Sequence, residues 1–406
     1  MLAPRIRAIS RRALAATFAT FALGASAAQA DTPTAFGPAL GASQAPIAAT
    51  FHRTTYHYSS ALAPAQEARL YRVIVLQSTD AAIVPALRAA NPMLKIFVYQ
   101  DGFLGRSADA TGATACSDYA SISTNHPSWF VQDQNGNRIM AKSYPGNYLM
   151  DVGNPAYQQS CAAHAVALAK ADGFDGIFFD GVTAWAGWAV QSGLSIPQYP
   201  TPAAWQSAMY SYLQTISTQV HANGLLAIAN IGGASITPGL WQKWTALFDG
   251  SEEESFTDSG SGVAGSLWNW KAQLADAAWS EANGKYALLH SFNRTEAGNT
   301  FGLATMLLVG AGHDTYSTSN ANYTNSETWY PEYTVAEQLG APVGAYTQLA
   351  NGVYERVFAG GVALVNPGKA VGQFSLGGGQ YSGSGLSNVR TVAMARGSGL
   401  ILARVG

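Results

Sequence analysis

The chain has 406 residues and a formal net charge of −2, and charged side chains make up only 11% of it, where about 25% is typical. Such a chain offers little positive charge to nucleic acid or to an anionic membrane, which argues against both as partners. Gly, Ser, Thr, Asn and aromatic residues replace the missing charges, and a surface of this kind suits a neutral polyhydroxylated ligand.

The first thirty residues have the three parts of a secretory signal peptide. The basic part contains Arg5, Arg7, Arg11 and Arg12. An apolar run follows from about Ala13 to Ala27, and Ala28-Gln29-Ala30 is an A-x-A cleavage site. The run is too short for a membrane anchor. We therefore expect a signal peptide over 1–30, cleavage near Ala30 and a secreted or periplasmic protein, in which 18 basic side chains remain against 24 acidic ones.

Several short apolar runs end in polar residues, and helix-length segments separate most of them. We interpret these runs as strands near residues 48–56, 72–77, 94–100, 174–180, 225–231, 246–254, 286–292 and 305–309. Asn154-Pro155 opens a helix predicted over 154–172, and Gly224 closes one predicted over 201–223. Continuous apolar strands that alternate with helices are typical of a parallel sheet covered on both faces. Eight of them predict an α/β fold, a (β/α)8 TIM barrel, with a doubly wound open sheet as the alternative.

From about residue 340 the pattern changes to short β-rich runs separated by Gly-rich turns, without a helical period. This change predicts a small C-terminal all-β sandwich over 339–406, which follows a barrel domain over 31–338.

The chain has two cysteines, Cys116 and Cys161. In an exported protein they can form a disulfide, and two separate buried thiols are the alternative. The seven histidines are scattered, and neither CxxC nor HxH spacing occurs near the cysteines. The sequence therefore predicts neither a metal site nor a cofactor.

Polar and aromatic side chains stand at the carboxyl ends of the predicted strands, where barrels of this kind carry their active sites. They are Tyr99, Asp101, Asp180, Asn230, the run Glu252-Glu253-Glu254, His290 and Tyr316. Carboxylates, amides and aromatic rings are the groups that bind a pyranose. We expect Asp101, Asn230 and Tyr316 to bind substrate, and strand-end hydrogen bonding is the alternative for Asp101 and Asn230.

Two strands repeat one spacing, because Asp175-Gly176 precedes Asp180 as Asp249-Gly250 precedes Glu254. If both strands enter the barrel alike, the side chains of Asp180 and Glu254 emerge at the same height. Two carboxylates that face one cavity are the minimal apparatus for glycoside hydrolysis.

Glu252 and Glu253 are the two alternatives to Glu254 as the second carboxylate. Strand side chains alternate, so Glu252 and Glu254 should share a face that Glu253 opposes. The matching spacing favours Glu254 as the acid.

Several longer segments carry a family resemblance. They are His126-Pro127-Ser128-Trp129-Phe130 with residues 133–136, residues 149–155, residues 174–180, the strand-six glutamate, residues 354–358 and residues 365–367. In these segments the chain resembles a hypothetical glycosyl hydrolase family of TIM-barrel type, related to the α-galactosidase-like glycoside hydrolase superfamily.

In that superfamily the nucleophile ends strand four and the acid/base ends strand six. The resemblance therefore implies Asp180 and Glu254 in these roles, a retaining mechanism and an α-linkage. It also implies that Trp129 and Asp151 approach the sugar, with a hydrophobic plug and a helix-start cap as their alternatives. Trp185 and Trp188, which follow Asp180, are the stronger stacking candidates.

The sequence as a whole predicts an exported glycoside hydrolase that acts on a poly- or oligosaccharide. A catalytically inactive carbohydrate-binding TIM barrel is the main alternative. An exported metal-dependent hydrolase is a third hypothesis, and it lacks the expected ligand spacing.

Overall fold

The computed structural model describes residues 51–55, 58, 62–116, 118–257, 269–292, 295–320, 323 and 328–405. The predicted signal peptide over 1–30 lies outside these residues. Among the helices described, none is both long and apolar enough to cross a membrane.

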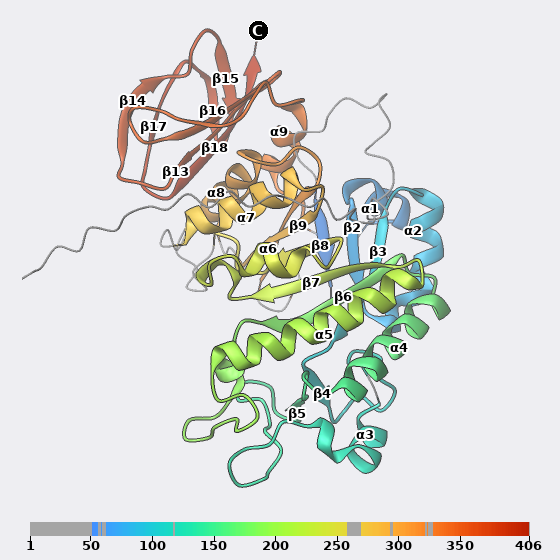
Figure 1. Cartoon of the computed structure of the whole chain (residues 1–406). Coiled ribbons are helices and arrows are strands. Elements are labelled where there is room, and N and C mark those ends of the chain that lie inside the picture. The colour runs from blue at the N-terminus through green and yellow to red at the C-terminus, as the bar shows by residue number, and fades with distance from the viewer. Residues whose placement is uncertain are drawn as a thin grey trace, which may run out of the picture. The chain divides into compact units, whose positions relative to one another are not determined.

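A closed parallel barrel forms the larger part of the described chain (Figure 1). In spatial order its strands are β1 (His52–Thr54), β2 (Val73–Leu76), β3 (Lys95–Asp101), β6 (Gly176–Thr183), β7 (Leu226–Gly232), β8 (Gly250–Glu253), β9 (Tyr286–Ser291) and β10 (Asp314–Thr318). A parallel bridge between Phe51 and Tyr316 joins the first strand to the last. The predicted (β/α)8 barrel is confirmed, and the open sheet is excluded.

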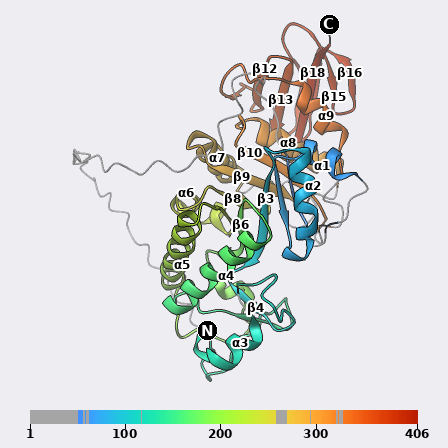
Figure 2. The same cartoon turned by 90° about the vertical axis from the view of Figure 1, so that its right-hand side faces the viewer.

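Helices surround this barrel. They are α1 (Pro64–Leu70), α2 (Val84–Ala90), α3 (Tyr119–Asn125), α4 (Pro155–Ala171), α5 (Pro202–Ala222), α6 (Leu240–Thr245), α7 (Trp270–Ala282), α8 (Glu296–Leu307) and α9 (Pro331–Gln338). Asn154 caps α4 by accepting hydrogen bonds from two backbone amides, and Thr201 caps α5 in the same way with one. Helices α4 and α5 lie side by side in both views (Figure 1 and Figure 2).

Alternation along the strands divides the barrel's apolar side chains into two sets. One set packs toward the helices. The other fills the barrel interior and consists of Val73, Val75, Phe97, Tyr99, Phe178, Ile228, Tyr286 and Leu288. Asp180 and Asn230 each stand two residues beyond an interior side chain, Phe178 and Ile228, so both point toward the barrel axis at its carboxyl end.

The predicted eighth strand is wrong. Residues 305–307 belong to α8, and the eighth strand is β10. Ten consecutive residues of α8, from Gly298 to Leu307, are buried. This helix lies between the barrel and two C-terminal strands, β13 (Gly361–Asn366) and β18 (Ser398–Val405). A helix that is buried all round lacks an amphipathic period, so its sequence resembles a buried strand.

The C-terminal strands form a six-stranded antiparallel sheet and a two-stranded sheet around an apolar core of their own. The larger sheet contains β11 (Thr347–Gln348), β12 (Tyr354–Phe358), β13 (Gly361–Asn366), β18 (Ser398–Val405), β15 (Gln380–Gly383) and β16 (Leu386–Val389). The smaller one pairs β14 (Val371–Ser375) with β17 (Thr391–Met394). Arg356 of β12 donates to the carbonyl oxygens of Leu307 and Gly310 at the end of α8, which anchors the sandwich to the barrel.

An insertion between β3 and β6 carries α3 and the antiparallel pair β4 (Leu104–Arg106) and β5 (Asn147–Leu149). A disulfide between Cys116 and Cys161 ties this insertion to α4. Of the two alternatives left open for the cysteines, the structure has the disulfide.

Candidate active site

A cavity of about 540 Å³ opens at the carboxyl ends of the barrel strands. Five of its lining residues are the strand-end residues Tyr99, Asp101, Asp180, Asn230 and Glu254. Asp101 and Asp180 are register partners across β3 and β6, so two carboxyl groups enter the cavity from neighbouring strands. The two aspartates and the glutamate that the strand-end pattern singled out therefore share one pocket.

A β-bulge in β6 positions the Asp180 side chain. The register between β6 and β7 shifts between Phe179 and Val182, and Gly181 in the bulge has a φ of +75°. A Cβ atom at Gly181 would lie 2.6 Å from Cβ of Phe103, so only glycine fits this position. The bulge directs the carboxyl group into the cavity, as bulges beside active sites commonly do.

Three donors hold the Asp180 carboxyl group. The Tyr99 hydroxyl donates to Oδ2 at 2.5 Å, and the Gly181 amide and Asn230 Nδ2 donate to Oδ1 at 2.7 and 3.0 Å. Both oxygens are therefore fixed in direction, and each can only accept when the group is ionised.

The Glu254 carboxyl group faces Asp180 across the Asn230 side chain. Asn230 Nδ2 donates to Glu254 Oε2 at 2.9 Å, and the Tyr323 hydroxyl donates to Oε1 at 2.6 Å. Burial raises the pKa of Glu254 above its ordinary value, and the negative charge of Asp180 raises it further. A raised pKa suits a carboxyl group that must hold a proton before reaction.

The shared amide sets the distance between the two carboxyl groups. Oδ1 of Asp180 and Oε2 of Glu254 both lie within 3.0 Å of Asn230 Nδ2, so these oxygens are at most about 6 Å apart. One amide group thus holds an oxygen of each carboxyl group within the same cavity.

Buried Asp101 and partly exposed Arg106 form an ion pair beside Asp180. Asp101 Oδ1 accepts from the backbone amides of Phe103 and Leu104, and Arg106 donates to Asp101 Oδ2 and to the Tyr99 hydroxyl. Burial, followed by the charge of Asp180, raises the pKa of Asp101 to about 6. Asp101 thus makes strand-end hydrogen bonds and lines the cavity at the same time.

Sequence reasoning missed Arg106, because it lies in the insertion and not at a strand end. Tyr323 and the bulge glycine were missed as well. A Gly directly after a strand-end Asp was the one available signal for the bulge.

The three consecutive glutamates have three different environments. Glu252 lies in the barrel interior, with Oε1 3.9 Å from His52 Nε2. Glu253 points the other way and accepts from Gln273 of α7, and Glu254 enters the cavity. Of the three glutamates, Glu254 is thus the one that lines the cavity.

Three of the predicted substrate-binding residues lie outside the cavity. Trp129 is buried and stacks on His126 with ring centres 4.0 Å apart, as the plug alternative expected. Asp151 accepts from the Tyr199 hydroxyl and the Gly153 amide. The family resemblance implied sugar contacts for both residues. In the structure, Trp129 instead packs on a ring and Asp151 hydrogen-bonds within the protein.

Tyr316 is the third of them. It is fully buried, and its hydroxyl donates to the carbonyl oxygen of Asn299 in α8. The neighbouring Thr315 hydrogen-bonds His52 inside the barrel, so alternation directs Tyr316 outward. The misplaced eighth strand was the source of this error.

The two tryptophans that follow Asp180 both line the cavity. Trp188 is 45% exposed, and its ring contacts the Tyr144 ring edge-on and the Phe103 ring at a tilt of 45°. A half-exposed indole ring thus borders the cavity, as the predicted stacking on a sugar ring requires.

Replacement of Trp188 with Ala should therefore raise KM roughly tenfold, a loss of about 1.4 kcal/mol of binding. Because the ring is half exposed and the two carboxyl groups do not touch it, kcat and the melting temperature should change little. Trp279 of α7, outside the cavity, is the matched control, since Trp279→Ala should leave KM unchanged. A large fall in Tm with an unaltered KM for Trp188→Ala would show a packing role instead.

Comparison with protein families assigns the chain to one of them. Residues 88–362 match the family model described as hypothetical glycosyl hydrolase family 15. No curated protein sequence gives a significant match.

Solved structures give weaker likenesses. AmyB, a maltogenic α-amylase from Thermotoga neapolitana, has a TM-score of 0.50 at 9% identity over 88% of this chain and 98% of its own. Ega3 from Aspergillus fumigatus, in complex with galactosamine, has a TM-score of 0.46 at 13% identity over 70% of this chain and 96% of its own. The glycoside hydrolase domain of PelA from Pseudomonas aeruginosa has a TM-score of 0.44 at 15% identity, over 67% of this chain and 95% of its own.

At these identities the AmyB likeness supports the barrel fold alone. The family model covers the barrel strands that carry Asp180, Asn230 and Glu254. The chain belongs to the hypothetical glycosyl hydrolase family 15.

Proposed function

We propose that this protein is an exported glycoside hydrolase that cleaves poly- or oligosaccharides by a retaining mechanism, with Asp180 as nucleophile and Glu254 as acid/base. The observation that carries the proposal is the Asn230 amide, which donates to both carboxyl groups within one cavity. Membership of a glycosyl hydrolase family supports it independently.

The first step forms a covalent intermediate. An Asp180 oxygen attacks the anomeric carbon, while the Glu254 carboxyl group gives its proton to the departing glycosidic oxygen. The bond between the anomeric carbon and that oxygen breaks, and the sugar becomes an ester of Asp180.

The second step reverses these roles. The Glu254 carboxylate takes a proton from water, the water oxygen attacks the anomeric carbon, and Asp180 leaves as a carboxylate. Two inversions restore the original anomeric configuration. No cofactor takes part in either step.

The residues around the two carboxyl groups hold them for this chemistry. Asn230 fixes their separation, and Tyr99, itself held by Arg106, orients the nucleophile. Trp185 and Trp188 are the proposed stacking surface for the sugar, and Asp101 borders the cavity beside them.

The proposal includes export and a division into domains. A signal peptide over 1–30 is removed near Ala30, and a catalytic barrel over 31–338 precedes a sandwich over 339–406. N-terminal sequencing of the exported protein should begin near Asp31, and an intact first thirty residues on that protein would contradict export by cleavage.

A panel of bacterial and plant glycans tests the activity. The wild-type protein should release reducing sugar from at least one glycan, and Asp180→Asn should release none while still binding it. Binding of a glycan without release by the wild type would establish the inactive carbohydrate-binding barrel instead.

A further inference from the structure

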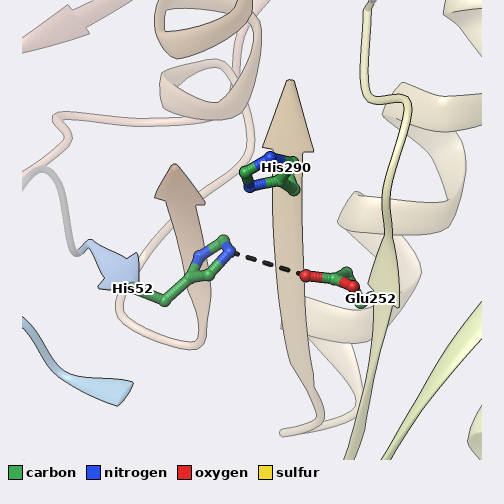
Figure 3. Close-up of side chains that lie close together, drawn as sticks. All are labelled: His52, Glu252 and His290. Carbon is green, nitrogen blue, oxygen red and sulfur yellow. Dashed lines mark ion pairs between the residues drawn. The ribbon is translucent and has the colours of Figure 1, made fainter. Parts of the chain in front are cut away.

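Three buried polar side chains meet inside the barrel (Figure 3). They are His52 of β1, Glu252 of β8 and His290 of β9, each at most 1% exposed. One nitrogen or oxygen atom from each lies within 4.8 Å of the other two. The cavity lining does not include any of the three, so the catalytic proposal leaves this cluster unexplained.

Hydroxyl groups orient both imidazole rings. The Thr315 hydroxyl is 2.9 Å from His52 Nδ1 and 3.5 Å from the carbonyl oxygen of Ala287, to which it can donate. The Ser319 hydroxyl is 2.9 Å from His290 Nε2 and donates to the carbonyl oxygen of Asn320. In the tautomer in which each hydroxyl gives its one proton to the carbonyl oxygen, the hydroxyl accepts from the imidazole, and the ring proton lies on that nitrogen.

The opposite ring nitrogens are then unprotonated. His52 Nε2 and His290 Nδ1 then each present a lone pair. Within the part of the chain that the structure describes, these two nitrogens and Glu252 Oε1 are buried without a hydrogen-bond partner, and the separation of 3.9 Å between His52 Nε2 and Glu252 Oε1 is too long for a hydrogen bond. Native proteins seldom bury polar atoms in this state without a reason.

We propose that His52, Glu252 and His290 bind one divalent transition-metal ion of the zinc type. Two imidazole nitrogens and one carboxylate are a ligand set that suits zinc, whereas magnesium and calcium prefer oxygen ligands. Bonds of about 2.0–2.1 Å in tetrahedral geometry require ligand atoms about 3.3 Å apart, so each side chain moves inward by less than about 1 Å. Thr315 and Ser319 accept from the far nitrogens of the two rings, as the hydrogen-bond partners of zinc-binding histidines commonly do.

The ion would join strands that are far apart in the sequence. Strand β1 has only three residues, and a single bridge links Phe51 beside it to β10. A metal ion bound by residues of β1, β8 and β9 would stabilise the closed barrel from its interior. Its role is structural, and no step of the proposed hydrolysis passes through it.

The experiment measures metal content and stability together. Untagged protein is unfolded in denaturant with a chelator, refolded with or without Zn²⁺, freed of excess metal and analysed by elemental mass spectrometry and thermal unfolding. Glu252→Gln and His290→Gln each remove one ligand. Glu253→Gln, a change to a buried acid on the opposite face of the same strand, is the matched control.

Wild type and Glu253→Gln should retain about one zinc per chain and gain at least about 5 °C in Tm from it. Glu252→Gln and His290→Gln should retain less than about a tenth as much and gain nothing. Wild-type protein refolded with Co²⁺ should show d–d absorption that both ligand variants lack.

Three results would overturn the proposal. The first is wild-type protein that contains no zinc after refolding with Zn²⁺ and has the same Tm as wild-type protein refolded without it. The second is zinc that both ligand variants retain, since that ion would lie elsewhere. The third is loss of zinc from Glu253→Gln alone. Each is independent of glycosidase activity, so failure of the metal site leaves the proposed function standing.

Discussion

Asp180→Asn is expected to lower the rate of glycan hydrolysis by roughly 10⁴-fold or more, because an amide cannot attack the anomeric carbon. The substitution is isosteric, and the new amide's carbonyl oxygen can still accept from Gly181 and Asn230. The melting temperature should therefore remain within a few degrees of wild type. Initial rates on any substrate from the glycan panel, together with thermal unfolding, check this result.

Asp175 is the matched control at the opposite end of the same strand. Its carboxyl group accepts from the Ile96 amide and from Arg88 and does not reach the cavity. Asp175→Asn should lower Tm while the folded protein keeps its activity. Retention of more than a few per cent of wild-type activity by Asp180→Asn would rule out the nucleophile role.

Glu254→Ala is expected to separate two kinds of substrate. An acid/base protonates the leaving group, so its loss should slow hydrolysis of the natural glycan by about 10²–10⁴-fold. An aryl glycoside with an acidic phenol as leaving group does not need that proton and should lose far less in its first step. Added azide should restore turnover in the Ala variant, because it attacks the intermediate without a general base and yields a glycosyl azide.

Glu253→Gln tests which glutamate of the run 252–254 is the acid/base. The substituted side chain keeps a carbonyl oxygen that can accept from the Gln273 amide, so this variant should hydrolyse both substrates at nearly the wild-type rate. A selective loss on the natural glycan in Glu253→Gln, without one in Glu254→Ala, would move the acid to the outer face of β8.

The barrel and the position of its two central carboxyl groups were predictable because both follow from repeated patterns. Apolar runs that end in polar residues predicted the strands, and the shared spacing in 175–180 and 249–254 placed both carboxyl groups at one end of the barrel. Asp175 and Asp249, which precede these two strands, accept from the amides of Ile96 and Ala227. Alternation along the strand set Glu253 apart from the other two glutamates, and the matching spacing favoured Glu254 over Glu252.

The remaining features depend on contacts between distant segments. Helix α8 was misread because its neighbours bury it on every side, which removes the period that identifies a surface helix. Arg106 and Tyr323 reach the active site from an insertion and a loop, and local sequence pattern does not specify such paths. His52 and His290 are separated by most of the barrel in sequence, so only closure of the sheet brings them to Glu252.

Covalent trapping on Asp180 tests the central claim most directly. A fluorinated glycosyl fluoride of the preferred sugar should form the glycosyl–enzyme quickly and hydrolyse slowly, and mass spectrometry of the digested protein locates the label. We predict one glycosyl unit on the peptide that contains Asp180, no label in Asp180→Asn, and release of the first product with its anomeric configuration retained. A label on a different carboxyl group, or a first product of inverted configuration, would contradict a retaining mechanism with Asp180 as the nucleophile.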